Sequence, residues 1–431
     1  MSRSTTRTVE VAPPVERAYL VALESPAAEQ WPVERRLVEL GALAAAAGAE
    51  VVGSASQRRS RPDPAWYFGK GRAADLADEK AMTGFSVLVV DDELSPAQQR
   101  NLEKLLDGKV LDRSALILDI FARHARTREG RLQVELAQLE YHLPRLTRLW
   151  THLSRTGGGI GTRGPGESQL ETDRRRIRER IHRLRGEIGQ VKRHRATASR
   201  RRDRSEIPVV ALVGYTNAGK STLLNALANA DAFVADMPFA TLDPTSRRIT
   251  LDSPRQVVLT DTVGFINKLP HDLIDAFRAT LEEVVRADLL LEVVDASDPD
   301  FVAQQETVHA VLSELGAGDK PRMTVFNKLD RLNGALASAG PQPADDHVAY
   351  VSALTGDGLP ELRERIATAL RGRLVAVDAV VPYPRAELLT RARQSGEVAE
   401  RFVDGGVRIT GRLPEALAGE IQAASAARTG A

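Results

Sequence analysis

The sequence predicts an α/β protein in which two regions of alternating strands and helices flank an antiparallel helical hairpin. Three observations lead to this prediction. Strand-like apolar runs alternate with helical patterns in residues 1–125 and again in residues 208–370. Residues 126–200 instead carry two heptad seams, which a cluster of glycines separates. Residues 371–431 then predict a small C-terminal α+β domain.

Composition narrows the class of protein. The chain contains no cysteine, which excludes disulfide bonds, thiolate zinc sites and a thiol nucleophile. No uninterrupted apolar stretch is long enough for a membrane-spanning helix, and the N-terminus does not resemble a signal peptide. We therefore expect a cytoplasmic protein, with partial association with a membrane left open. No exposed seam demands a second copy, so we expect a monomer.

The N-terminal region is expected to form a small parallel sheet with helices on its faces. A loop rich in arginine and proline, residues 58–76, interrupts the pattern and carries Trp66 and Tyr67. These rings can stack on nucleic-acid bases, or they can cap the edge of the hydrophobic core; the sequence leaves both open. The expected strands are residues 18–24, 50–54 and 86–94, and the expected helix is residues 33–48.

Two apolar seams with a 4-3-4-3 spacing predict the helical hairpin. Residues 157–166 between the seams form its tip, because no helix tolerates so many glycines beside Pro165. Pro144 predicts a kink in the first seam, and residues 197–208 are expected to be a linker. The first seam is Leu132, Leu136, Leu139, Leu143 and Leu146, followed by Trp150, and the second is Ile177, Ile181, Leu184, Ile188 and Val191.

Positive charge is concentrated on the returning helix of the hairpin. Residues 171–204 hold fourteen Lys and Arg against five Asp and Glu, a net charge of +9 in a chain whose formal net charge is +1. A basic segment on a mildly acidic body indicates a polyanion partner at one place. The alternative is a solvated, charged coiled coil that only joins two domains.

The stretch "VVALVGYTNAGKST" predicts a phosphate-binding loop between a strand and a helix. Gly214 and Gly219 allow backbone N–H groups to surround phosphates at a helix N-terminus, whose dipole favours anions. Lys220 supplies a cation to the β- and γ-phosphates, and Ser221 supplies a hydroxyl for Mg²⁺. A chance glycine turn is the alternative, and the flanking strand and helix argue against it.

Two further segments supply candidates for the γ-phosphate and Mg²⁺. Asp261 follows a strand-like run and is placed to hold Mg²⁺ through water, and Gly264 can turn its N–H toward a γ-phosphate. In "FATLDPTSRR", either Thr241 or Thr245 can complete the Mg²⁺ shell, and spacing does not choose between them. An ordinary strand-end aspartate and a plain loop are the alternatives.

The stretch "FNKLD" after a further strand predicts guanine as the base. The Asp330 carboxylate can accept from guanine N1–H and the exocyclic amine, a donor pair that adenine does not present. Asn327 can reach O6 and N7, and the stem of Lys328 can lie over the ring. Backbone N–H groups of Ser352–Leu354 can contact O6. A polar surface turn is the alternative.

The residue after "DTVG" is Phe265, where Ras-like GTPases carry a glutamine that orients the attacking water. Phenylalanine cannot do this, so we assign no catalytic residue. We expect slow intrinsic GTP hydrolysis that rises when a partner orders the site or supplies the missing group. A polar residue from elsewhere in the chain is the alternative.

Together these motifs resemble the HflX family of translation-factor-class GTPases. The resemblance is carried by "GGGIGTRGPGESQLETDRR", "GYTNAGKSTLLNAL", "FATLDPT" and "DTVGFI", and it extends from about Val11 to Leu370. It implies a ribosome-binding GTPase that binds the large ribosomal subunit and its rRNA and rescues, splits or recycles ribosomes. It also implies GTP and GDP as substrate and product, Mg²⁺ as cofactor, and Ser221 and Thr241 as the Mg²⁺ ligands.

The resemblance implies a nucleotide pocket built from five segments. It also fits the expectation, drawn from the residues of the hairpin, that a tip of small residues enters a narrow RNA cavity. The pocket residues are Gly214, Tyr215, Thr216, Asn217, Ala218, Gly219, Lys220, Ser221, Phe239, Ala240, Thr241, Leu242, Asp243, Asp261, Thr262, Val263, Gly264, Asn327, Lys328, Leu329, Asp330, Ser352, Ala353 and Leu354; the tip residues are Arg155, Gly157, Gly158, Gly159 and Arg163.

Two other functions remain as alternatives. A GTP-regulated module that binds free structured RNA fits the basic helix equally well. A remodeller that also uses ATP through the N-terminal region has less support, because Phe68–Arg72 lacks the spacing of a phosphate loop.

Overall fold

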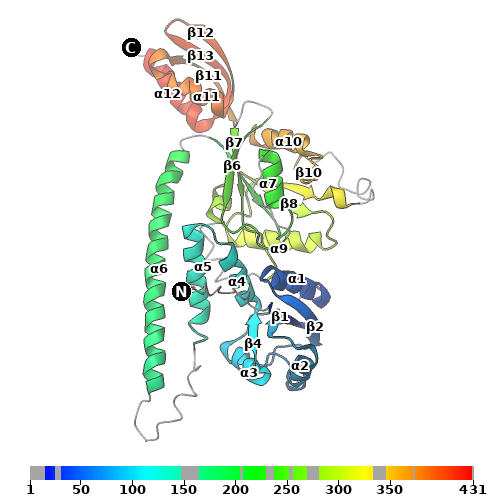
Figure 1. Cartoon of the computed structure of the whole chain (residues 1–431). Coiled ribbons are helices and arrows are strands. Elements are labelled where there is room, and N and C mark those ends of the chain that lie inside the picture. Colours follow the sequence, from blue (N-terminus) through cyan, green and yellow to red (C-terminus); the bar gives the residue numbers. More distant parts are fainter. Residues whose placement is uncertain are drawn as a thin grey trace, which may run out of the picture. The chain divides into compact units, whose positions relative to one another are not determined.

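The computed structural model divides the chain into two compact units, Met1–Ile120 and Phe121–Ala431 (Figure 1). It describes residues 15–24, 31–146, 165–203, 207–229, 237–251, 256–268, 281–332, 346–371 and 374–429. The α/β fold class is confirmed, whereas the four-part division of the chain stays a prediction.

The first unit contains a four-stranded parallel sheet with strand order β2-β1-β3-β4. Its β1 strand is buried at six consecutive residues, as expected for a parallel strand that is covered on both faces. The strands are β1 (Arg17–Glu24), β2 (Glu50–Arg58), β3 (Val87–Val90) and β4 (Lys109–Asp112); the helices are α1 (Val33–Ala46), α2 (Lys70–Thr83), α3 (Pro96–Leu106) and α4 (Arg113–His124), which crosses into the second unit.

Trp66 and Tyr67 belong to the core of the first unit. Tyr67 is 1% exposed, and its hydroxyl donates a hydrogen bond to Asp92. Trp66 is half-buried and packs against the same cluster of apolar side chains. Burial of Tyr67 therefore favours the role of capping the core over the role of stacking on bases.

The helical hairpin consists of α5 (Arg128–His142) and α6 (Pro165–Asp203), which lie side by side (Figure 1). Three expectations need correction. Pro144 does not kink α5, because the helix has already ended, and Leu143 and Leu146 lie beyond it. Pro165 starts α6, since proline is tolerated in a first helical turn. The expected linker begins inside α6.

Apolar contacts hold α5 against α6. Leu184 of α6 is fully buried, and it forms a cluster with Leu132 of α5 and Ile188 of α6. Ion pairs flank the cluster, of which Arg180–Glu135 is bidentate with both distances 2.8 Å. Because these charged side chains are well exposed, they add little free energy, and the buried leucines supply most of the attachment.

The second unit also contains a six-stranded sheet with order β10-β9-β8-β5-β7-β6. Five strands are parallel, and β6 at the edge is antiparallel to β7. The sequence does not predict β6, because Ile249 is its one buried side chain. The elements are β5 (Val209–Val213), α7 (Lys220–Ala228), β6 (Thr245–Thr250), β7 (Gln256–Asp261), β8 (Leu289–Asp295), α9 (Phe301–Glu314), β9 (Arg322–Asn327), η2 (Leu329–Arg331), β10 (Val348–Tyr350) and α10 (Leu359–Arg371).

The C-terminal segment forms a three-stranded antiparallel sheet with order β11-β13-β12 and its own apolar core. This agrees with the expected α+β character. The elements are β11 (Leu374–Pro382), η3 (Tyr383–Arg385), α11 (Glu387–Ser395), β12 (Glu397–Val403), β13 (Gly406–Pro414) and α12 (Glu415–Thr429). Among the described residues, no helix combines the length and apolar character needed to cross a membrane.

Replacing Leu184 by alanine is expected to loosen the hairpin, because the change leaves a cavity between α5 and α6. A buried Leu→Ala change costs about 2–4 kcal/mol. We expect backbone amides of residues 177–191 to exchange with deuterium faster than in the unchanged chain. The exposed neighbour Arg183 provides the control, and Arg183→Ala should leave exchange unchanged. Equal protection in both variants would contradict the packing described here.

Candidate functional site

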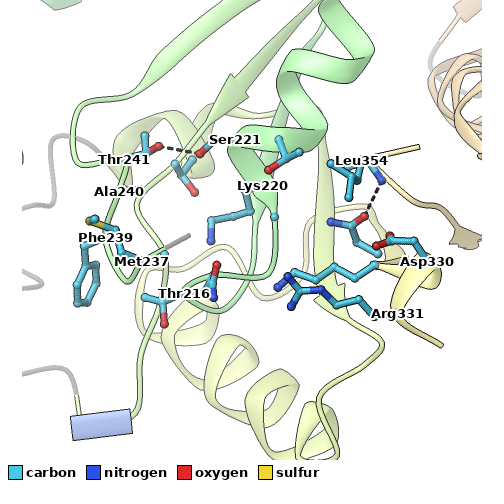
Figure 2. Close-up of a pocket in the computed structure, with 18 residues that line it drawn as sticks. Thr216, Lys220, Ser221, Met237, Phe239, Ala240, Thr241, Asp330, Arg331 and Leu354 are labelled. Carbon is cyan, nitrogen blue, oxygen red and sulfur yellow. Dashed lines mark hydrogen bonds between the residues drawn. The ribbon is translucent and has the colours of Figure 1, made fainter. Parts of the chain in front are cut away.

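A pocket of about 390 Å³ lies at the carboxyl ends of the parallel strands of the six-stranded sheet (Figure 2). Gly214 directly follows β5, Asp261 ends β7 and Asn327 ends β9. Carboxyl ends of parallel strands are the usual ligand sites of such sheets. The pocket is lined by Thr216, Asn217, Gly219, Lys220, Ser221, Thr222, Met237, Phe239, Ala240, Thr241, Thr262, Gly264, Asn327, Lys328, Asp330, Arg331, Ala353 and Leu354.

The turn that leads into α7 requires glycine at position 219. Its φ of +94° is in a region that side-chain-bearing residues rarely adopt. A Cβ at Gly219 would also lie 2.3 Å from Nδ2 of Asn327. The close approach allows Asn327 Nδ2 to donate to the Ala218 carbonyl at 3.0 Å. The phosphate loop is therefore tied to the end of β9.

Lys220 starts α7, and its ammonium group points into the centre of the pocket (Figure 2). Its Nζ donates to the carbonyl oxygens of Gly214 at 3.1 Å and Tyr215 at 2.7 Å. Burial lowers the pKa of Lys220 to about 8; the Asp261 carboxylate opposes this shift, and the Lys328 cation adds to it. The site thus contains a buried cation that an anion would stabilise.

Three oxygen-bearing side chains meet beside Lys220. Ser221 Oγ donates to Asp261 Oδ2 at 2.6 Å, and it lies 2.7 Å from Thr241 Oγ1. Asp261 Oδ1 is buried and makes no hydrogen bond within the described part of the chain. Burial raises the pKa of Asp261, while Lys220 and the Ser221 hydroxyl act in the opposite direction.

This oxygen cluster fits a hard divalent cation, since hydroxyl and carboxylate oxygens are the ligands that Mg²⁺ prefers. The buried, unsatisfied oxygen of Asp261 is the observation that supports the fit. Of the two candidate threonines, Thr241 lies in the cluster, whereas Thr245 is the first residue of β6 and does not line the pocket. The geometry therefore favours Thr241.

The opposite end of the pocket is formed by the residues after β9. Ser352 Oγ donates to Asp330 Oδ1 at 2.6 Å, which fixes that carboxylate at the pocket wall. Lys328 Nζ pairs with Asp295 at 2.7 Å, which holds the lysine stem across this end. Asn327 also accepts from the Ala353 N–H at 2.9 Å. The sequence does not predict this bridging role of Asn327, because both partners are backbone atoms distant in the chain.

Phe265 does not line the pocket, and its side chain is fully buried. Its backbone instead pairs with the phosphate loop: the Phe265 N–H donates to Gly214 O at 3.1 Å, and its carbonyl accepts from Thr216 N–H at 2.8 Å. The prediction that this residue cannot orient water is consistent with this placement.

Fifteen of the predicted pocket residues line the pocket, and nine others do not. The nine are Gly214, Tyr215, Ala218, Leu242, Asp243, Asp261, Val263, Leu329 and Ser352. Three lining residues are not predicted: Thr222, Met237 and Arg331. Thr222 and Arg331 directly follow predicted motifs, so their position next to those motifs is the sequence feature that could identify them. The tip candidates Arg155, Gly157, Gly158, Gly159 and Arg163 lie outside the described residues.

Asp243 departs most clearly from its predicted place at the nucleotide. Its carboxylate accepts hydrogen bonds from the backbone N–H groups of Arg126 and Thr127, each at 2.8 Å. The side chain therefore points to the start of α5, where N–H groups that lack helical partners attract a carboxylate.

Four family models match the chain. They are described as GTP-binding GTPase N-terminal (residues 34–122), GTP-binding GTPase middle region (124–202), 50S ribosome-binding GTPase (209–328) and HflX C-terminal domain (341–426).

Curated relatives match over most of their length. The GTPase HflX of Caldanaerobacter subterraneus is 48% identical over 92% of this chain and 90% of its own. The GTPase HflX of Escherichia coli is 44% identical over 88% of this chain and 89% of its own. A GTP-binding protein from Sulfolobus solfataricus, solved in complex with GDP, is 25% identical with a TM-score of 0.43, over 82% of this chain and 98% of its own.

The lowered pKa of Lys220 predicts that GDP affinity falls as pH rises above about 8. The free protein loses the Lys220 proton near that pH, whereas bound phosphates require the charged form. Affinity at pH 9 should be about tenfold weaker than at pH 7. Titration with a fluorescent GDP analogue at constant ionic strength measures this change.

The matched control is Lys220→Arg, because a guanidinium stays charged throughout this range. Any change in the protonation of GDP itself is the same for both proteins. A difference in pH dependence between them therefore comes from Lys220. An equal loss of affinity in both proteins would contradict the prediction.

Proposed function

Because the chain belongs to the HflX family of GTPases, we propose that it is a GTP-driven switch that binds the large ribosomal subunit and splits, rescues or recycles ribosomes. The GTPase activity and membership of a 50S ribosome-binding family follow from the relatives. The ribosomal task is the proposal, and the observation that carries it is the set of exposed arginines along α6.

Helix α6 is long and carries exposed positive charge. Helix α6 has 39 residues, which gives a length of about 58 Å at 1.5 Å per residue. Arg178 and Arg183 are exposed, and neither has an ion-pair partner among the described residues. Uncompensated arginines on a stiff helix suit the phosphate backbone of rRNA, which supplies most of the affinity in such complexes.

The pocket supports binding of GTP with Mg²⁺. In this proposal Lys220 contacts the β- and γ-phosphates, Ser221 and Thr241 hold Mg²⁺, and Asp330 accepts from the guanine edge. When bound, Mg²⁺ neutralises charge on the phosphates. The chain's own part is to fix these groups and to exclude adenine.

Regulation follows from what the pocket lacks. Phe265 leaves no side chain at the position that orients water in Ras-like enzymes, so we propose that hydrolysis is slow until the ribosome orders the site. A nucleotide can shift ribosome binding only if its affinity differs between two states of the protein. We therefore propose that the GTP form binds the large subunit more tightly than the GDP form.

GTP turnover with and without purified large ribosomal subunits tests this proposal. We expect strong stimulation by the subunits, and we expect most of it to be lost when Gly157, Gly158 and Gly159 are replaced by alanine. GDP affinity of this variant serves as the control and should not change. Absence of stimulation in the unchanged chain would contradict the ribosomal function.

Charge removal on α6 is expected to weaken ribosome binding in a salt-dependent way. Replacing Arg178 and Arg183 by alanine removes two phosphate contacts. The slope of log affinity against log salt concentration should become shallower by about 1.5. As a control, Arg401→Ala removes one exposed arginine from β12 instead of α6 and should leave the slope unchanged.

The alternative function, binding of free structured RNA, makes a different prediction in the same assay. Isolated rRNA would then bind as tightly as whole large subunits, and GTP in place of GDP would not favour the subunits. That result, or an unchanged salt slope in the arginine variant, would overturn the assignment of α6 to the ribosome.

A further inference from the structure

The short segment Phe239–Asp243 makes contacts in two directions. Thr241 lies beside Ser221 at the pocket, with 2.7 Å between the two hydroxyl oxygens (Figure 2). Asp243, two residues further along, contacts the start of α5 instead. One segment therefore touches both the candidate Mg²⁺ ligands and the base of the helical hairpin.

The contact at Asp243 is a specific one. One carboxylate oxygen accepts from the backbone N–H groups of Arg126 and Thr127, and the other accepts from the Thr127 hydroxyl at 2.5 Å. Hydrogen bonds to an ionised carboxylate are stronger than those between neutral groups. Because three donors converge on this carboxylate, its position relative to Arg126 and Thr127 is fixed.

Helix α5 is shaped to receive this carboxylate. A Cβ at Gly130 would lie 2.4 Å from Asp243 Oδ1, so no other residue allows the same approach. Gly130 is the third residue of α5, and glycine is a poorer helix former than alanine. The presence of glycine at this position is explained by the space that the Asp243 carboxylate needs.

An aromatic contact supports the other end of the segment. Phe239 has a φ of +59°, which is unfavourable for a bulky residue, and it is 2% exposed. Its ring packs edge-to-face on Phe121, with 4.7 Å between the ring centroids. Phe239, before Thr241, is thus attached to the last turn of α4, and Asp243, after it, to the start of α5.

The attachment continues into the hairpin. Thr127 is the N-cap of α5: its hydroxyl oxygen accepts from the Gly130 N–H at 3.0 Å while its proton is directed to Asp243. Leu132, one turn further along α5, packs against Leu184 of α6. A continuous chain of contacts therefore runs from Thr241 through Asp243 and Thr127 to α6.

We propose that Asp243 is a positioning residue for GTP hydrolysis, which holds Thr241 beside Ser221 through its hydrogen bonds to the start of α5. The inference rests on the proposed role of Thr241 at Mg²⁺. It adds that the base of the helical hairpin is part of the hydrolytic machinery. Displacement of the start of α5 would withdraw Thr241 from the metal without touching the phosphate loop.

The first test is Asp243→Asn, which keeps the shape but removes the negative charge and one of the two acceptor oxygens, so the Thr127 hydroxyl and the two backbone N–H groups can no longer all donate to this side chain. We expect kcat to fall about tenfold and the Mg²⁺ concentration for half-maximal turnover to rise. GDP affinity and the KM for GTP should change by less than about twofold, because the phosphate loop and Asp330 are untouched.

Thr127 provides an independent pair of variants. Thr127→Ala should reproduce the loss of kcat, and Thr127→Ser, which keeps the hydroxyl, should restore it. Because the two side chains act as one unit, the double variant with Asp243→Asn should lose less than the product of the single effects. Asp378→Asn, in a salt bridge with Arg408 on the C-terminal sheet, is the matched control and should leave all values unchanged.

Three results would overturn the inference. Unchanged kcat and Mg²⁺ dependence in Asp243→Asn would show that the contact does not position Thr241. A parallel loss of GDP affinity, KM, kcat and thermal stability would indicate a purely structural role. Mg²⁺-independent turnover by the unchanged chain would refute the proposed role of Thr241 itself. This result is obtained from the unchanged chain alone, so it is distinguished from a failure of the inference about Asp243.

Discussion

The nucleotide pocket depends on the backbone pairing between Phe265 and the phosphate loop. The Phe265 N–H and carbonyl bond to Gly214 and Thr216, and the side chain is fully buried. This pairing brings Gly264 against Thr216 and close to the Lys220 ammonium. The same contact has a chemical consequence. A residue that anchors the loop through a buried ring cannot also orient water, so hydrolysis needs a group from somewhere else.

The walls of the pocket differ in how they are fixed. Backbone pairing with Phe265 holds the phosphate loop, and the Asn327 side chain joins that loop to the base end. The third wall, Phe239–Asp243, is instead attached to residues outside the six-stranded sheet. Switching segments are typically those whose order depends on a few contacts. By this criterion the third wall is the one that can respond to nucleotide and partner.

The phosphate loop, Asp261 and the residues after β9 can be predicted from the sequence, because their chemistry fixes residue types at close spacing. Strand β6 cannot be predicted in this way, because its side chains are mostly exposed and give no apolar alternation. The end of α5 at His142 cannot be predicted either, since leucine periodicity alone does not show that the helix ends before Pro144.

Side-chain direction was the information that sequence could not supply. Thr241 and Asp243 belong to one motif, yet they contact partners that lie about twenty and more than a hundred residues away. Because both residues belong to one motif, the sequence predicts that both contact the nucleotide. Only the three-dimensional contacts show that Thr241 faces the pocket and that Asp243 faces α5. Asn327 is a similar case, since its two backbone partners are Ala218 and Ala353.

The helical hairpin is attached to the GTPase core at two points, and both lie at its base. Helix α6 ends at Asp203, shortly before β5, which leads directly into the phosphate loop. The start of α5 holds Asp243. In an antiparallel pair the start of one helix and the end of the other are at the same end, so the end of α5 and the start of α6 are at the opposite end of the pair. Nucleotide in the pocket and a partner bound to the hairpin could therefore influence each other only if the contacts at the base differ between two states of the protein. The third wall of the pocket, which carries one of these two attachments, is the element in which such a difference would be seen.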